Sequence, residues 1–101
     1  MDNKLIDYNR LSNVVKILTG AKLLILDNLL RYDSIRVREL YQIINFSDES
    51  IEEGIRYLDN EGFVEVHQDD EGYSYMVLTD KGKSIEEVVD SMVNWINNHK
   101  C

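Results

Sequence analysis

The sequence has no proline and only one cysteine, Cys101. A single cysteine excludes a disulfide within the chain and a metal site made of several cysteines. A terminal thiol is also more often a free surface group than a catalytic one. Long apolar runs are absent as well: the longest, residues 23–26, lies between Lys22 and Asp27, whereas spanning a bilayer takes roughly 20 apolar residues. Since residues 1–4 show no signal-peptide pattern, we expect a cytoplasmic protein that does not contact a membrane.

The composition fits one folded domain covering residues 1–101. Hydrophobic residues make up 44% of the chain and charged residues 30%, which is too apolar for a disordered chain. No internal repeat, low-complexity tract or linker divides the sequence. A chain of this length is too short for two domains.

The spacing of apolar residues predicts the secondary structure. Several segments repeat apolar residues at i, i+3, i+4 and i+7, which indicates amphipathic helices, and two strand-like segments flank the polar turn 68–72. We expect helices at about 11–19, 21–32, 37–44, 48–60 and 80–98, a very short strand at 35–36, and a hairpin at about 63–78. The order helix, short helix, helix, hairpin is that of a winged helix-turn-helix. The predicted fold is mainly α with a small β-hairpin, with the helix-turn-helix at about 37–60, the wing at about 63–78, and extension helices at both ends.

Four segments resemble known transcriptional regulators. Residues 57–64 (YLDNEGFV) are similar to the "RLEEEGLV" junction between recognition helix and wing, and residues 78–83 (LTDKGK) to the "LTEKGK" run that follows the wing in MarR, PadR and HxlR regulators. Residues 17–26 (ILTGAKLLIL) resemble the "IGGKWTLLIL" segment of the HxlR type, and residues 88–95 (VVDSMVNW) resemble its closing helix. The resemblance extends from about residue 11 to the end of the chain and is closest to the HxlR type.

This resemblance implies a homodimeric transcriptional regulator. DNA contacts would come from the third helix and the hairpin, and dimer contacts from the first and last helices. The candidate dimer residues are Leu11, Val15, Val88, Met92, Trp95 and Ile96. HxlR-type proteins typically carry a cysteine near the N-terminus, redox-active in some members, and here no cysteine precedes Cys101. Redox sensing is therefore not implied.

The charge distribution opposes this expected role. Residues 48–71 hold ten carboxylates and one base, Arg56, a net charge of −9, while the whole chain carries −8. Binding to DNA depends on basic side chains that displace counterions from phosphates. The available bases are Arg31, Arg36, Arg38, Arg56, Lys81 and Lys83, and the candidate DNA-binding residues are Arg36, Arg38, Ser50 and Arg56.

A competing interpretation is a winged helix that binds a basic protein or occupies a nucleic-acid site as a phosphate mimic. Its candidate residues are Glu49, Glu52, Glu53, Asp69 and Asp70. The two interpretations differ in whether the three arginines form one basic patch or are neutralised by neighbouring acids. A third possibility is that these carboxylates only solvate an exposed surface.

Enzymatic activity has no support in the sequence. His67 and His99 lack a second ligand at metal-binding spacing, and no glycine-rich loop follows a strand. Glu52 and Glu53 are adjacent on a predicted helix and so point about 100° apart, a poor geometry for paired acid and base catalysis. We expect a non-enzymatic protein with no metal or cofactor.

Overall fold

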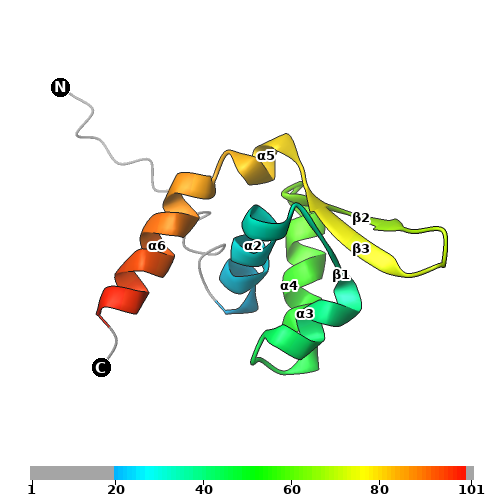
Figure 1. The fold of residues 1–101 in the computed structure, drawn as a ribbon, viewed down its shortest axis with the longest axis horizontal. Coiled ribbons are helices and arrows are strands. Elements are labelled where there is room, and N and C mark those ends of the chain that lie inside the picture. The colour runs from blue at the N-terminus through cyan, green and yellow to red at the C-terminus, as the bar shows by residue number, and fades with distance from the viewer. Residues whose placement is uncertain (1–19, 100–101) are drawn as a thin grey trace.

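The computed structural model describes residues 20–99, which form a winged helix (Figure 1). The elements in chain order are α2 (Ala21–Tyr32), β1 (Ser34–Arg36), α3 (Val37–Ile43), α4 (Asp48–Asn60), β2 (Val64–Gln68), β3 (Ser74–Leu78), α5 (Asp80–Lys83) and α6 (Glu86–Asn98). The predicted mainly α class with a β-hairpin is confirmed, and so is the very short strand before α3. The expected helix at 11–19 lies outside the described residues.

Helix α2 is the centre of the hydrophobic core. Its residues Ile25, Leu26 and Leu29 are at most 1% exposed, as expected for a helix with apolar residues on most of its circumference. Helices α3, α4 and α6 and strands β2 and β3 contribute further side chains that are at most 1% exposed, namely Leu40, Ile51, Leu58, Val64, Met76 and Val89. The core is therefore assembled around α2 and holds α3 and α4 in the helix-turn-helix arrangement.

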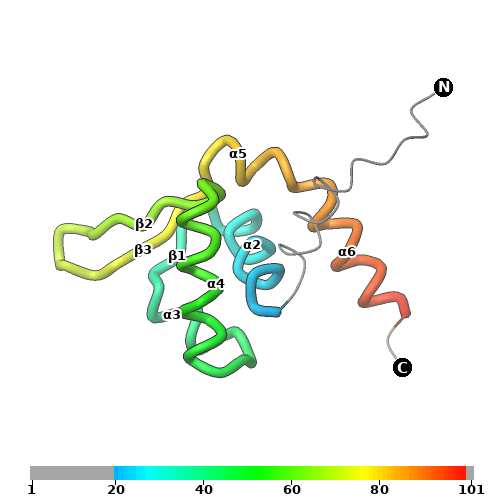
Figure 2. Tube along the Cα trace, turned by 180° about the vertical axis from the view of Figure 1, so that it is seen from behind, coloured from blue at the N-terminus to red at the C-terminus, as the bar shows by residue number. Residues whose placement is uncertain are grey.

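The three strands form one antiparallel sheet in the order β1-β3-β2. Strands β2 and β3 make the wing, a hairpin that projects from the helices on the side away from α6 (Figures 1 and 2). Strand β1 pairs with β3 so that Arg36 faces Tyr75. This register places Arg36, the residue that immediately precedes α3, beside the wing.

The segment LTDKGK joins the wing to the end of α4. The Thr79 hydroxyl donates to the Gly62 carbonyl at 2.5 Å, and its oxygen accepts the Gly82 N–H at 3.1 Å, which caps α5. Lys81 Nζ donates to the Glu61 carbonyl at 2.6 Å and lies over the Phe63 ring. Lys81 thus binds a carbonyl at the C-terminal end of α4, where a cation is favoured, and this contact occupies a base that the sequence offered to DNA.

Gly82 in this segment is required by close packing. A Cβ atom there would overlap the carbonyl oxygen of Phe63 and lie 2.8 Å from Leu78 Cδ2. Only a residue without a side chain lets α5 approach the strand this closely. The motif that resembles regulators is therefore a structural connection that sets the position of the wing.

The expected single helix at about 80–98 is divided into α5 and α6. The Ser84 hydroxyl donates to the Lys81 carbonyl at 2.6 Å, and Ile85 turns into the core with 8% exposure. Helix α6 then packs on α2 through Val89, which is fully buried. None of the helices within residues 20–99 has the length and apolar character needed to cross a membrane.

Candidate nucleic-acid interface

Helix α4 occupies the position of the recognition helix, and it begins at a serine cap. The Ser47 hydroxyl oxygen accepts the Ser50 N–H at 3.1 Å, and the two hydroxyls are 3.0 Å apart. Ser50, a candidate DNA contact, is thus half-buried and committed to the cap. Such a cap supplies a partner for an N–H group that has none within the helix.

One side of α4 packs against α2 and the other faces solvent. Ile51 and Leu58 are fully buried, and a Cβ atom at Gly54 would lie 3.1 Å from Ile25 Cδ1. The outward positions hold Glu49, Glu52, Glu53 and Arg56, all exposed. Asp48 and Asp59 are exposed as well, so the solvent-facing surface of α4 carries five carboxylates and one guanidinium.

Arg56 is paired with one of these carboxylates. Its Nη2 lies 3.6 Å from Glu52 Oε1, one turn earlier on the helix, and both side chains are more than 60% exposed. The acidic character of α4 also reaches α3: burial, and then the Glu52 and Asp48 carboxylates, raise the pKa of Tyr41. The solvent-facing surface of α4, the helix in the recognition position, is therefore negatively charged.

Arg36 lies in a cluster at the tip of the wing, which we call the wing-tip cluster: Arg36, Asp69, Glu71 and Tyr73. The Arg36 Nη2 atom is 3.0 Å from Asp69 Oδ2 and 2.8 Å from Glu71 Oε1, and the guanidinium carbon lies 4.6 Å from the centre of the Tyr73 ring. The Glu71 hydrogen bond is the main cause that raises the pKa of Arg36. Two wing carboxylates therefore neutralise this candidate residue.

The turn of the wing holds Asp69 in place for this contact. Its Oδ1 accepts the N–H groups of Glu71 at 2.9 Å and Tyr73 at 3.0 Å, while its Oδ2 faces Arg36. Gly72 adopts φ 86°, which the turn needs and glycine tolerates. Burial alone would raise the pKa of Asp69, but the two N–H groups and the guanidinium outweigh it and lower this pKa.

Within the part of the chain that the structure describes, Arg38 is the candidate base whose charge no carboxylate neutralises. Its guanidinium lies 5.4 Å from the centre of the Tyr73 ring, on which Arg36 also stacks. Among the ion pairs between residues 20–99, Arg38 takes part in none. The structure therefore brings Arg36 and Arg38 together on one aromatic ring, and it gives Arg56 a separate partner on α4.

Tyr73 is a site residue that sequence reasoning missed. This side chain is 41% exposed and supports two guanidinium groups. Cation–π stacking of this kind orients arginines without neutralising them. Only the pairing of β1 with β3 identifies the contact, since Tyr73 lies 35 residues after Arg38 along the chain.

The expected dimer residues of α6 form an exposed apolar stripe. Val88 is 38% exposed, Trp95 58% and Ile96 44%, and Met92 is half-buried. Trp95 also stacks on His99, with ring centres 4.4 Å apart. Leu11 and Val15, the other two candidates, lie outside the described residues.

Comparison with known proteins identifies the family. A model of the HxlR-like helix-turn-helix family matches residues 18–101. The chain belongs to the HxlR-like helix-turn-helix family. A comparison with curated protein sequences found no match.

Solved structures show the same winged-helix fold as this HxlR-like protein. The redox regulator HypR in its oxidized form superposes with a TM-score of 0.78 at 18% identity, covering 91% of this chain and 98% of HypR. The reduced form of the transcriptional regulator YodB from B. subtilis gives 0.70 at 21% identity, covering 90% and 92%. A protein assigned to the MarR family from Enterococcus faecalis gives 0.74 at 17% identity, covering 96% and 91%. These similarities extend over nearly the full length of each neighbour.

Proposed function

We propose that this HxlR-like protein is a homodimeric transcriptional regulator that binds double-stranded DNA through α3, α4 and the wing. The observation that carries the proposal is the placement of Arg36 and Arg38 together on Tyr73, where α3 begins and the wing lies alongside. In helix-turn-helix proteins the first helix of the motif crosses the DNA backbone while the second enters the major groove. Family membership supports the same role.

Arg38 is the proposed first phosphate contact, because its charge is not neutralised within the described residues. Arg36 would follow by exchanging its wing carboxylates for a phosphate. These ion pairs are exposed, with Arg36 39% and Glu71 70% accessible, and exposed pairs are weak and are screened by salt. A phosphate presents the same anionic oxygens to the guanidinium, so the exchange conserves the bonding of Arg36.

The homodimer is proposed to form through α6. Its apolar stripe of Val88, Met92, Trp95 and Ile96 continues beyond the contact that Val89 makes with α2. A two-fold axis along this stripe would bury the exposed side chains of both copies and duplicate the DNA-binding surface. Duplicated surfaces match the paired half-sites that dimeric helix-turn-helix proteins bind.

A second candidate is docking to a basic protein surface, and the ion pairs of Arg36 and Arg56 favour it. With these two bases neutralised, α4 and the wing present mainly Glu49, Glu53 and Asp70 to solvent. Placing that charge near DNA opposes binding at distances within a Debye length of about 8 Å. This candidate predicts no DNA binding by the unmodified protein.

Fluorescence anisotropy with a random-sequence duplex at low salt separates the two candidates. The regulator predicts binding that weakens with added salt and is lost in Arg38→Ala, while Lys16→Ala, which removes a base outside the motif, serves as the charge-matched control. The variant Glu49→Gln, Glu52→Gln, Glu53→Gln should bind more tightly than the unmodified protein. Binding only after these carboxylates are neutralised would reject the regulator and favour the basic-protein partner.

A further inference from the structure

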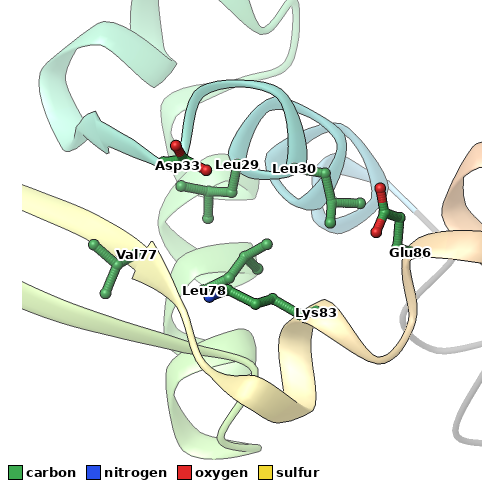
Figure 3. Close-up of a pocket in the computed structure, with 7 residues that line it drawn as sticks. All are labelled: Leu29, Leu30, Asp33, Val77, Leu78, Lys83 and Glu86. Carbon is green, nitrogen blue, oxygen red and sulfur yellow. The ribbon is translucent and has the colours of Figure 1, made fainter.

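A cavity of about 510 Å³ lies outside the proposed DNA-binding surface (Figure 3). It is a hollow half open to solvent, bounded by the end of α2, by β3, and by the segment from α5 to the start of α6. Small-molecule sites typically measure about 300–1,000 Å³. The cavity is therefore large enough for a small organic ligand.

Part of the cavity wall is apolar, while polar atoms supply the larger share of its exposed lining. Leu29 and Leu30 from α2 face Leu78 from β3, with Val77 beside them (Figure 3). Leu29 is only 1% exposed and belongs to the core, so this wall is fixed by packing. An apolar group placed here would leave water for a preformed apolar surface.

Three charged residues surround this interior: Asp33, Lys83 and Glu86. The Lys83 side chain runs alongside Leu78, with Asp33 and Glu86 at separate places on the rim (Figure 3). Among the ion pairs between described residues, none joins these three groups to one another. In contrast to the wing-tip cluster, their charges do not neutralise each other by direct contact.

Asp33 has an unusual backbone that places an acid at this rim. It is the residue after α2, with φ 63° and ψ −47°, and it is the one non-glycine residue in the described part of the chain with positive φ. Glycine would adopt this conformation at lower cost. Strained residues of this kind concentrate at ligand and active sites, so the carboxylate here calls for an explanation beyond the turn.

We propose that the cavity binds a small amphipathic organic amine. The apolar body of the amine would lie on Leu30 and Leu78, and its ammonium group would face Asp33, with Glu86 as a more distant negative charge on the same rim. Among the residues that line the cavity, two carboxylates outnumber the one ammonium of Lys83, so a cation is favoured over an anion. The ligand would contact the core helix, the wing strand β3 and the start of α6 together.

Monodansylcadaverine, a fluorescent apolar amine, tests this proposal on the full-length protein. We expect saturable binding that weakens about five-fold in Asp33→Asn, the scale of one lost charge interaction near a surface, and by a smaller factor in Glu86→Gln. Asparagine tolerates positive φ nearly as well as aspartate, so Asp33→Asn removes the charge and keeps the turn. The matched control is Glu87→Gln, which removes a neighbouring charge that does not line the cavity.

Lys83→Met distinguishes the sign of the ligand. It should tighten binding of monodansylcadaverine and leave the anionic probe anilinonaphthalene sulfonate without a saturable site. Tight binding of the anionic probe to the unmodified protein, lost in Lys83→Met, would overturn the proposal in favour of an anion. Equal binding of the amine to the unmodified protein and to both acid variants, or no saturation up to about 1 mM, would also overturn it. Neither result depends on whether the protein binds DNA.

Discussion

The wing-tip cluster leads to a quantitative prediction about DNA binding. The double variant Asp69→Asn, Glu71→Gln removes both carboxylates that hold Arg36, at 3.0 and 2.8 Å. Asparagine retains a side-chain oxygen that can accept the N–H groups of the turn, so the wing should keep its shape. Arg36 would then be free to contact a phosphate while still stacked on Tyr73.

The expected change is in the salt dependence of binding. In the unmodified protein the exchange frees two carboxylates, which take up cations and offset the counterions that Arg36 displaces from a phosphate. In the double variant this offset is absent, so each Arg36 contact adds its full ~0.9 to the slope of log K against log salt concentration, and the slope of a dimer becomes steeper by up to about 1.8. Between about 50 and about 200 mM salt, that difference becomes a roughly tenfold larger loss of affinity. Anisotropy titrations of a random duplex at several salt concentrations measure both slopes directly.

The control must remove the same charge at a distance from the wing. Glu87→Gln, Asp90→Asn changes two exposed carboxylates on α6, at the opposite end of the molecule from the wing (Figure 2). General charge reduction should tighten binding at low salt in both double variants but steepen the slope only in the wing variant. Equal slopes in the two variants would refute the assignment of Arg36 to phosphate.

Four further predictions follow from the structure. Gly82→Ala should destabilise the protein by about 1–3 kcal/mol, because its Cβ overlaps a backbone carbonyl, and thermal melting should show a fall of several degrees. Ser47→Ala removes the cap of α4 and should lower the urea-unfolding free energy by about 1 kcal/mol. Ile96→Glu should give the monomer mass by light scattering, because a buried charge disfavours the proposed dimer. Folding lowers the pKa of Asp69. The stabilisation by this carboxylate is therefore complete above its unfolded pKa of about 3.9 and is lost as pH falls through the lower pKa of the folded state. The Tyr73 amide signal in NMR should report that lower midpoint.

Matched variants make these outcomes decisive. Gly54→Ala places a Cβ 3.1 Å from the end of the Ile25 side chain and overlaps no backbone atom, so it should cost less than Gly82→Ala, and an equal loss would contradict the packing argument. Glu87→Gln should leave the oligomeric state unchanged where Ile96→Glu alters it. A Tyr73 signal that titrates at or above about 3.9 would show that the turn does not bind the Asp69 carboxylate.

Much of the fold is encoded in local patterns. Periodic apolar residues predicted α2, α3, α4 and the wing strands, because a helix or strand that packs on a core must repeat apolar side chains with its own period. The prediction of one continuous helix at about 80–98 was wrong. The apolar periodicity of residues 85–96 carries no signal for the turn at Ser84 and Ile85. That turn depends on packing of Gly82 against Phe63, which lies on a different segment.

The candidate site was only partly predictable. The sequence identified Arg36, Arg38 and Arg56 as its bases and residues 48–71 as strongly acidic. It did not show which acid faces which base, nor that Tyr73 supports two of the arginines. Ser50 was expected to reach DNA, but the structure places it in the helix cap.

The sequence by itself determined the order of the elements, the winged-helix class and the concentration of negative charge on α4 and the wing, because these depend on residue type and short-range spacing. Only the tertiary structure decided how that charge is used. Pairing of β1 with β3 brings Arg36 to carboxylates more than 30 residues away in the chain, leaves Arg38 beside them, and gathers Asp33, Lys83 and Glu86 around one cavity. Such contacts arise from the distance between segments after folding, and electrostatic interactions depend on that distance.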